Sequence, residues 1–242
     1  MLIPSLITIF ALAAAPSVQS IGEKIWMNEC SGILENLTHW GKGEEFASFG
    51  IGHFIWYAEK KEERFEERFP ALLAFIEKHG EPLPKWLKNH PACPWKTREE
   101  FYAQFQSPQM IELRHFLFNT KQLQALFMAE RLEKEFPQMI ATSQDKEKAM
   151  VQFNKLIKSP RGLYALVDYL NFKGAGTSLS ETYQGKGWGL LQVLLTMSPS
   201  GDEVAAFTKA AQDILTERVK NSPPERNEKK WLTGWLNRVK TY

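Results

Sequence analysis

Carboxylate side chains near residues 30 and 45 are the groups in this chain best spaced for acid chemistry. Hydrolysis of a glycosidic bond usually needs two carboxyl groups, one that protonates the leaving oxygen and one that stays ionised. Glu29 ends an apolar helical face flanked by Trp26 and Ile33, where burial favours the protonated form. Glu44 and Glu45 lie in a glycine-bounded, hydrated turn, where a carboxylate stays ionised. The sequence therefore nominates Glu29 as the acid and one turn glutamate as its partner.

Glu35 is a rival of Glu29 for the acid role, because its local setting is similar. The chain has 28 acidic residues, so some pairs of this kind arise by chance. A solvated surface position is the ordinary role of any one of them. Spacing alone therefore leaves the choice of acid open.

His53 closes a glycine-punctuated run that begins at Ser48. A histidine in this place can serve as a general base or as a metal ligand. No second histidine stands at ligand spacing and no HExxH motif occurs, so neither a metal nor a cofactor is predicted. A structural histidine that donates to backbone near a hairpin is favoured.

A second informative stretch, residues 164–176, is an apolar helix that ends in Asn171, Lys173 and two glycines. Asn171 and Lys173 are placed to hydrogen-bond a ligand or the hairpin. A helix C-cap with a glycine turn explains both glycines, and Asn171 in part, without any ligand. Alternate glycines over residues 185–189 lack the spacing of a dinucleotide loop, so nucleotide binding is rejected.

The elements that must position these residues are mostly helical, as judged from hydrophobic periodicity. An amphipathic helix from Ile21 ends near Glu29, and Gly41 and Gly43 break the pattern. Residues 46–53 then alternate with a period of two, which predicts a short hairpin strand. The expected class is therefore α+β, mostly α, with one small β-hairpin element. A long helix is predicted from residue 107 through 132, and Pro137 is expected to interrupt it. Other helices are predicted to start at residue 97 and to span residues 59–79, 143–158, 160–173, 188–197, 203–219 and 225–239.

The first 20 residues differ from the rest, because they carry no charged side chain and their apolar run is too short to span a membrane comfortably. They are typical of a secretory signal peptide, so residues 21–242 are expected to form the mature domain, periplasmic or secreted, with no later membrane span. The net charge of +2, from 30 basic and 28 acidic residues, does not favour a nucleic-acid partner. The protein is expected to be a monomer. An exported chain permits one disulfide between Cys30 and Cys93, and two buried free thiols are the alternative.

Four of these pieces, in this order, resemble the phage-type lysozymes (muramidases) of the lysozyme superfamily. Residues 28–30 resemble the helix-end Glu-Gly of that family. Residues 48–53 resemble its Thr-Ile-Gly-x-Gly-His run, with Ser48 where the family has its active-site Thr. Residues 165–176 resemble its Ala-Leu…Phe-Asn-x-Gly-x-Gly helix end, and residues 218–242 resemble its closing segment.

The chain also departs from the pattern of that family. Cys30 stands in place of the Gly after the acid, and Glu44 or Glu45 replaces the usual loop Asp. The spacing from the acid to Ser48 is 19 residues, several more than the family's usual spacing. Residues 59–158 are not accounted for by the resemblance, and this middle part is longer than in small phage lysozymes.

The resemblance implies a lysozyme-like fold, which is a helical domain with a small β-hairpin element beside the active-site cleft. It implies an exported glycosidase that cleaves peptidoglycan, an amino-sugar polymer, with inversion. Glu29 would be the general acid, Glu44 or Glu45 would position water or stabilise the transition state, and Ser48 would hold that water. Substrate contacts are expected from three further residues: His53, Asn171 and Lys173.

Other functions stay open at this point. Residues 187–192 are also similar to the Gly-Leu-Met-Gln element of lytic transglycosylases and goose-type lysozymes, which would nominate Glu181 as the acid. Glu29 is preferred, because the Gly-Ile-Gly-His run lies downstream of it, as superfamily geometry requires. The remaining alternatives are a non-catalytic carbohydrate-binding or envelope protein on a lysozyme scaffold, and a chitosanase.

Overall fold

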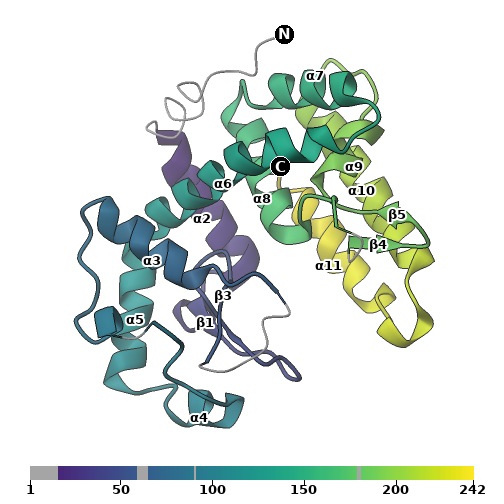
Figure 1. The fold of residues 1–242 in the computed structure, drawn as a ribbon. Helices are drawn as coiled ribbons and strands as arrows, with labels where there is room; N and C mark the ends of the chain where they lie inside the picture. Colours follow the sequence, from purple (N-terminus) through teal and green to yellow (C-terminus); the bar gives the residue numbers. More distant parts are fainter. Residues whose placement is uncertain (1–15, 59–64, 90, 179–180) are drawn as a thin grey trace. The chain divides into compact units, whose positions relative to one another are not determined.

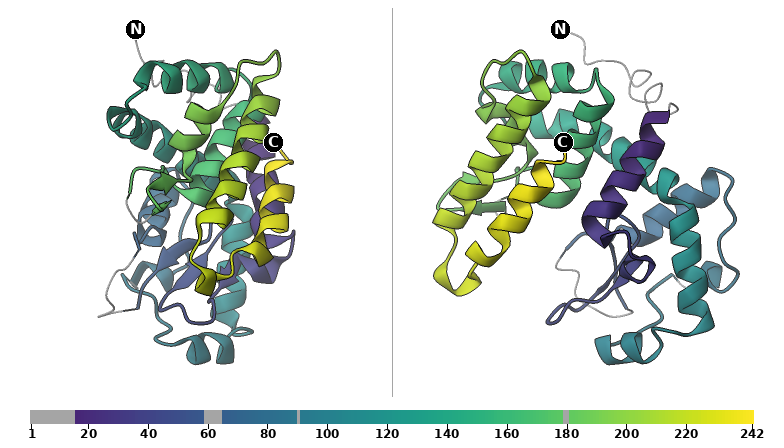
Figure 2. Two further views of the ribbon diagram at one scale, coloured as in Figure 1. Left: turned by 90° about the vertical axis from the view of Figure 1, so that its right-hand side faces the viewer. Right: turned by 180° about the vertical axis from the view of Figure 1, so that it is seen from behind.

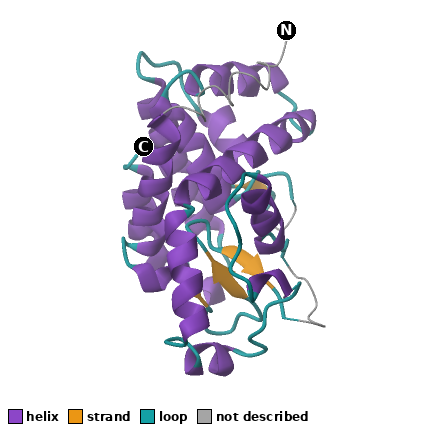
Figure 3. Cartoon of the chain, turned by 90° about the vertical axis from the view of Figure 1, so that its left-hand side faces the viewer, coloured by secondary structure: helices purple, strands orange, loops and turns teal. Residues whose placement is uncertain are grey.

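A computed structural model describes residues 16–58, 65–89, 91–178 and 181–242. Over these residues the chain is a mostly helical α+β protein, with ten α-helices, a three-stranded antiparallel sheet and a separate two-stranded hairpin (Figure 1). Figure 3 shows how small the share of strand is beside the helices. The expected class is therefore confirmed at this level.

The chain divides into two compact units, which we call the N-terminal unit (residues 14–128) and the C-terminal unit (residues 129–242). The range 21–242, treated above as one domain, contains both. Residues 1–15 of the predicted signal peptide lie outside the described residues, and helix α2 begins at Pro16. No helix in the described ranges combines the length and apolar character needed to cross a bilayer.

The N-terminal unit is built around a three-stranded sheet in the order β1-β2-β3, with all neighbours antiparallel. Phe49 of the middle strand is fully buried, and its ring packs against four other aromatic rings: Trp56, Phe69, Trp95 and Phe101. This aromatic core holds the sheet against the surrounding helices and loops, since each such side chain buries a large apolar area. The elements of this unit are α2 (Pro16–Cys30), η1 (Leu34–Leu37), β1 (Thr38–His39), β2 (Ala47–Phe49), β3 (Phe54–Trp56), α3 (Phe69–Lys78), η2 (Leu87–Asn89), α4 (Arg98–Ala103), α5 (Pro108–Asn119) and the start of α6 (Lys121–Ala141).

The single strand predicted over residues 46–53 is wrong. Strand β2 ends at Phe49, and the chain turns through residues 50–53 into β3. Gly50 and His53 have positive φ values of 74° and 48°, which are incompatible with a continuous strand. The Gly50 N–H donates to the carbonyl of Leu37 (2.8 Å), so the turn is tied to the segment before β1. The expected single hairpin strand is thus replaced by a tight turn between two strands of a three-stranded sheet.

Three of the predicted helix starts are confirmed by their capping hydrogen bonds. The side chains of Thr97, Ser107 and Ser159 each accept a backbone N–H from the first turn of the helix that follows. The helix predicted over residues 203–219 is capped by Asp202, whose carboxylate accepts two backbone N–H groups. These signals are local in sequence, so they were readable without the fold.

Three predicted helix boundaries are wrong. The helix predicted over residues 107–132 is two helices, because α5 ends at Asn119 and α6 begins at Lys121. Pro137 does not interrupt α6, which continues to Ala141. A proline inside a helix removes one backbone hydrogen bond. The neighbouring Phe136 is buried and its ring stacks on Phe153, with ring centroids 3.6 Å apart, and this packing offsets the loss. The helix predicted from residue 59 begins only at Phe69, and residues 59–64 lie outside the described ranges.

The C-terminal unit packs its helices around α8, whose residues 162–170 are all buried. Helices α7, α9 and α10 contact α8, and α10 also runs beside α11 (Figure 2). Buried Asp168 on α8 ties in the end of the chain, because it accepts two hydrogen bonds from Arg238 (2.9 Å each) and one from the Tyr242 hydroxyl (2.8 Å). The elements after α6 are α7 (Lys146–Leu156), α8 (Pro160–Lys173), β4 (Thr182–Tyr183), β5 (Lys186–Gly187), α9 (Leu190–Thr196), α10 (Glu203–Asn221), η4 (Pro224–Arg226) and α11 (Lys229–Val239).

Candidate active site

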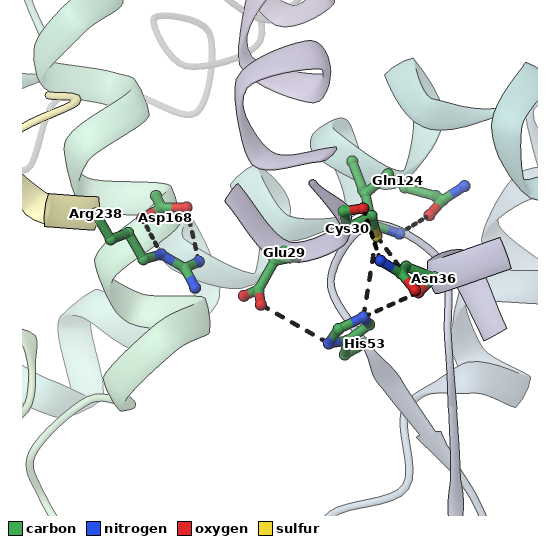
Figure 4. Close-up of polar contacts among 8 residues, drawn as sticks. Glu29, Cys30, Asn36, His53, Gln124, Asp168 and Arg238 are labelled. Atoms are coloured by element: carbon green, nitrogen blue, oxygen red, sulfur yellow. Dashed lines mark hydrogen bonds and ion pairs between the residues drawn. The ribbon is translucent and has the colours of Figure 1, made fainter. Parts of the chain in front are cut away.

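Glu29 lies on the last turn of α2 and faces the turn between β2 and β3. Its side chain is 16% exposed, and its Oε2 lies 3.7 Å from Nδ1 of His53 (Figure 4). The helix-end carboxylate and the histidine of the Gly-Ile-Gly-His run are 24 positions apart in sequence and adjacent in the structure. This pair is the centre of the candidate site.

The end of α2 is fixed by the segment that follows it. The carbonyl of Cys30 accepts hydrogen bonds from the Ile33 N–H (2.9 Å) and from Nδ2 of Asn36 (3.0 Å). Ser31 and Gly32 between them have positive φ values, so the chain reverses sharply. A helix end with satisfied carbonyls holds its last side chains in place.

The position of His53 is fixed from the other side. Its Nε2 lies 3.2 Å from the carbonyl oxygen of Asn36. The turn that carries it is held by Gln124 of α6, a fully buried residue whose Oε1 accepts the N–H of Ile51 (2.8 Å). Gln124 in turn donates to the carbonyl of Leu117 (2.6 Å), so a polar side chain inside the unit anchors the turn.

The other acidic candidates of this unit are exposed. Glu44 and Glu45 lie in the loop before β2, and Oε2 of Glu44 accepts the N–H of Gly41 (3.1 Å) within that same loop. Glu35, the rival acid, is exposed in η1. Partial burial at a helix end therefore distinguishes Glu29 from all three. Ser48 is nearly buried in β2, where it is registered between His39 and Ile55.

The two substrate contacts predicted in the C-terminal unit lie on the last turn of α8. Lys173 is nearly buried, and its Nζ lies 3.4 Å from the ring centroid of Trp235 and 3.9 Å from that of Phe172. Such a position is a cation–π contact. Asn171 is half-buried on the same turn. Both residues lie within the C-terminal unit.

Glu181, the acid that a transglycosylase would use, organises a turn. Its Oε2 accepts the backbone N–H groups of Gly176 (2.7 Å), Thr177 (3.0 Å) and Ser178 (3.3 Å). Three donors on one oxygen hold the glycine turn after α8 in shape. This arrangement gives Glu181 a structural role in the described chain.

Cys30, His53 and Glu29 together have the order of a nucleophilic triad, which would indicate a different class of enzyme. The Cys30 Sγ lies 3.9 Å from Nε2 of His53, and Glu29 faces the other ring nitrogen. Burial, and then the charge of Glu29, raises the pKa of the Cys30 thiol to about 12. A reactive thiol needs a lowered pKa and access to solvent and substrate. The buried Cys30 thiol, with its raised pKa, therefore does not suit a nucleophile.

Of the two states left open for the cysteines, the structure has two buried free thiols. Burial raises the pKa of Cys93 to about 12 as well. At pH 8 a thiol with that pKa is ionised to about one part in 10⁴, so both should be nearly inert toward a chromogenic disulfide reagent. We expect two equivalents of thiol to react rapidly in denaturant and almost none in the folded protein. Rapid reaction of one native thiol, or no reaction after unfolding, would contradict this prediction.

Sequence reasoning missed three contributors to the site: Asn36, His39 and Gln124. His39 stacks on His53, with ring centroids 6.1 Å apart. Loss of hydration, then the neighbouring His53, lowers the pKa of His39, and Glu44 partly offsets this effect. The available signal for Gln124 was its place as a polar residue on the apolar face of α6. A buried polar side chain is usually hydrogen-bonded to another part of the fold.

The described residues contain no group of three His, Cys, Asp or Glu side chains arranged to hold a metal ion. Comparison of this chain with protein families, curated proteins and solved structures gives no match.

Proposed function

We propose that this chain is an exported, lysozyme-like glycoside hydrolase that cleaves the glycan strands of peptidoglycan, with Glu29 as the general acid. The observation that supports it most is the contact of 3.7 Å between Glu29 and His53. It joins the two motif elements on which the resemblance to phage-type lysozymes depends, the helix-end acid and the Gly-Ile-Gly-His turn.

The proposed mechanism divides the work between two carboxyl groups. Glu29, largely shielded from water, donates its proton to the leaving glycosidic oxygen. Glu44 or Glu45, both exposed and therefore suited to stay ionised, activates a water or stabilises the oxocarbenium-like transition state. Ser48 holds that water. Inversion would need the two carboxyl groups roughly 6.5–9.5 Å apart.

A lytic transglycosylase using Glu181 is disfavoured by the three backbone donors on that carboxylate. A carbohydrate-binding protein without activity and a chitosanase remain alternatives to peptidoglycan hydrolysis. One scaffold hosts many functions, so the reaction products decide among these three. Each of them makes a different product or none.

Product analysis tests the proposal. The protein is incubated with purified peptidoglycan and, separately, with soluble chitosan, and the products are separated by mass and reducing-end content. We expect new reducing ends from peptidoglycan. Anhydro ends would indicate transglycosylation, and sugar release from chitosan alone would indicate a chitosanase. Sedimentation with peptidoglycan without any product would indicate a binding protein, and each of these three results would overturn the proposal.

A further inference from the structure

Two tryptophans lie one turn apart on α11 in the C-terminal unit, and their rings form a short aromatic row at its surface. The ring centroids of Trp231 and Trp235 are 6.0 Å apart, and their planes make an angle of 31°. Trp231 is 43% exposed, although a side chain of this size usually buries most of its area. The row therefore begins half-buried at Trp235 and ends in solvent at Trp231.

Trp235 is held in place by two cations. The Nζ of Lys173 lies 3.4 Å from its ring centroid, and the guanidinium carbon of Arg218 lies 4.8 Å from it. Arg218 is itself fixed, because Glu228, whose side chain is fully buried, accepts two hydrogen bonds from it (2.8 Å each). The row is therefore built before any ligand arrives, which lowers the entropy lost on binding.

Gly234 leaves open space beside the exposed ring. It lies inside α11, three residues after Trp231, so the two positions are neighbours on the helix surface. A glycine inside a helix lowers stability relative to other residues. Its φ is not positive, and a Cβ atom on it would meet no described atom within 4 Å apart from its chain neighbours and the α11 backbone. Neither packing nor backbone conformation requires glycine here, whereas close approach of a ligand to the helix would.

The surface around the row is basic. Residues 229–242 contain four basic side chains and no acidic one. Lys229 and Lys230 among them are exposed, and the Nζ of Lys230 lies 4.5 Å from the ring centroid of Trp231. A ligand that suits this surface has a flat apolar face for the ring and negative charge for the lysines.

A glycan strand that carries carboxylates has both features. One face of a pyranose ring presents C–H groups, which pack against the negative face of an indole. We propose that Trp231, Gly234 and Lys230 form a second glycan-binding site, in which a sugar ring of peptidoglycan stacks on Trp231 and a stem-peptide carboxylate pairs with Lys230. The choice of peptidoglycan among anionic glycans rests on the proposed function. Binding at this site would retain the protein on the insoluble polymer between cleavage events.

The packing of α11 favours a glycan over a membrane surface. A helix that binds in the bilayer interface presents a broad apolar face to the lipid. In α11 the apolar side chains other than the tryptophans are packed, since Val239 is fully buried and Leu232 and Leu236 are half-buried. Within α11, all of which is described, Trp231 is the only large apolar side chain that is exposed. One exposed indole matches a sugar ring and is too small a surface to insert a helix.

Sedimentation with purified insoluble peptidoglycan tests the site, with every variant made in the Glu29→Gln background so that turnover does not interfere. We expect Trp231→Ala to weaken binding by about tenfold, similar to the loss of one aromatic ring that stacks on a nucleic-acid base. The matched control is Ile111→Ala on α5, which removes another exposed apolar side chain (40% exposed) and should leave binding unchanged. Gly234→Leu should raise the thermal midpoint, because leucine is the better helix former, and still weaken binding by blocking the open space.

Unchanged binding of Trp231→Ala or Gly234→Leu, or an equal loss in Ile111→Ala, would overturn the second site. Binding to phosphatidylglycerol vesicles that exceeds binding to peptidoglycan and is lost in Trp231→Ala would overturn it as well, because the surface would then serve a membrane. The two proposals fail separately. If the wild type releases reducing ends while Trp231→Ala sediments normally, only this inference fails. If no product forms while sedimentation depends on Trp231, the proposed hydrolysis fails and the glycan site stands.

Discussion

Glu29→Gln should lower the rate of peptidoglycan cleavage by about 10²–10⁴-fold, which is the usual contribution of a general acid. The amide has nearly the same shape as the carboxyl group but no acidic proton to give. The side chain is 16% exposed and lies at the end of a capped helix, so the substitution should not disturb the fold. The measurement is the release of reducing ends from purified cell wall at fixed enzyme concentration.

The matched control is Glu35→Gln. Glu35 is the acid that local sequence cannot distinguish from Glu29, but it is exposed in η1. We expect this variant to cleave at the wild-type rate. Full activity of Glu29→Gln, or a comparable loss in Glu35→Gln, would show that the acid has been assigned to the wrong residue.

Asp168→Ala should destabilise the protein by about 3–5 kcal/mol, the usual cost of removing one partner from a buried ion pair. Asp168 is fully buried and accepts both hydrogen bonds of the Arg238 guanidinium. Burial, and then the charge of Asp168, raises the pKa of Tyr242 well above its usual value, so the phenol remains a donor to this carboxylate. Removing Asp168 leaves a buried cation and a buried hydroxyl without their acceptor. Urea unfolding, followed by tryptophan fluorescence, gives the change in free energy of unfolding.

An exposed pair in the same unit provides the control for that loss. Asp213 pairs with Lys209 one turn earlier on α10, and both side chains are more than half exposed. Exposed pairs of this spacing contribute about 0.3–0.5 kcal/mol, so Asp213→Ala should change stability little. Equal losses in the two variants would mean that the Asp168 contacts do not stabilise the unit beyond an ordinary surface pair.

The parts of the fold that sequence could predict are those set within one turn of helix. Ser107 and Ser159 precede prolines, and each caps the helix expected after it. A cap and a proline at the first helical position act on the backbone beside them. No distant partner is required, so local pattern was sufficient.

The turn at residues 50–53 was beyond the reach of local pattern. Apolar and small residues alternate there as they do in a strand. Its conformation depends on Gln124, whose side chain accepts the Ile51 N–H from 73 residues away. Pro137 failed as a helix breaker for a related reason, since buried neighbours from another helix offset its missing hydrogen bond.

The two side chains at the centre of the candidate site were predictable from the sequence, but the backbone contact that positions the histidine was not. Glu29 and His53 were nominated from residue type and order, and the structure places them in contact. The Nε2 atom of His53 contacts the backbone carbonyl of Asn36. Every residue type at position 36 would supply that carbonyl. Contacts made through backbone atoms leave no mark in residue types, so this contact required coordinates.

The left-handed backbone conformation of His53 affects which residues selection for stability would favour at that position. Glycine adopts a φ of 48° without steric cost, whereas histidine, although more common there than most residues, adopts it at some cost in stability. Glycine at position 53 would relieve that cost, and selection for heat resistance alone would favour it. If the proposed function holds, a lineage that retains histidine there keeps a less stable turn because the site uses the imidazole. Retention of His53 under such selection would thus mark relatives that still use the site.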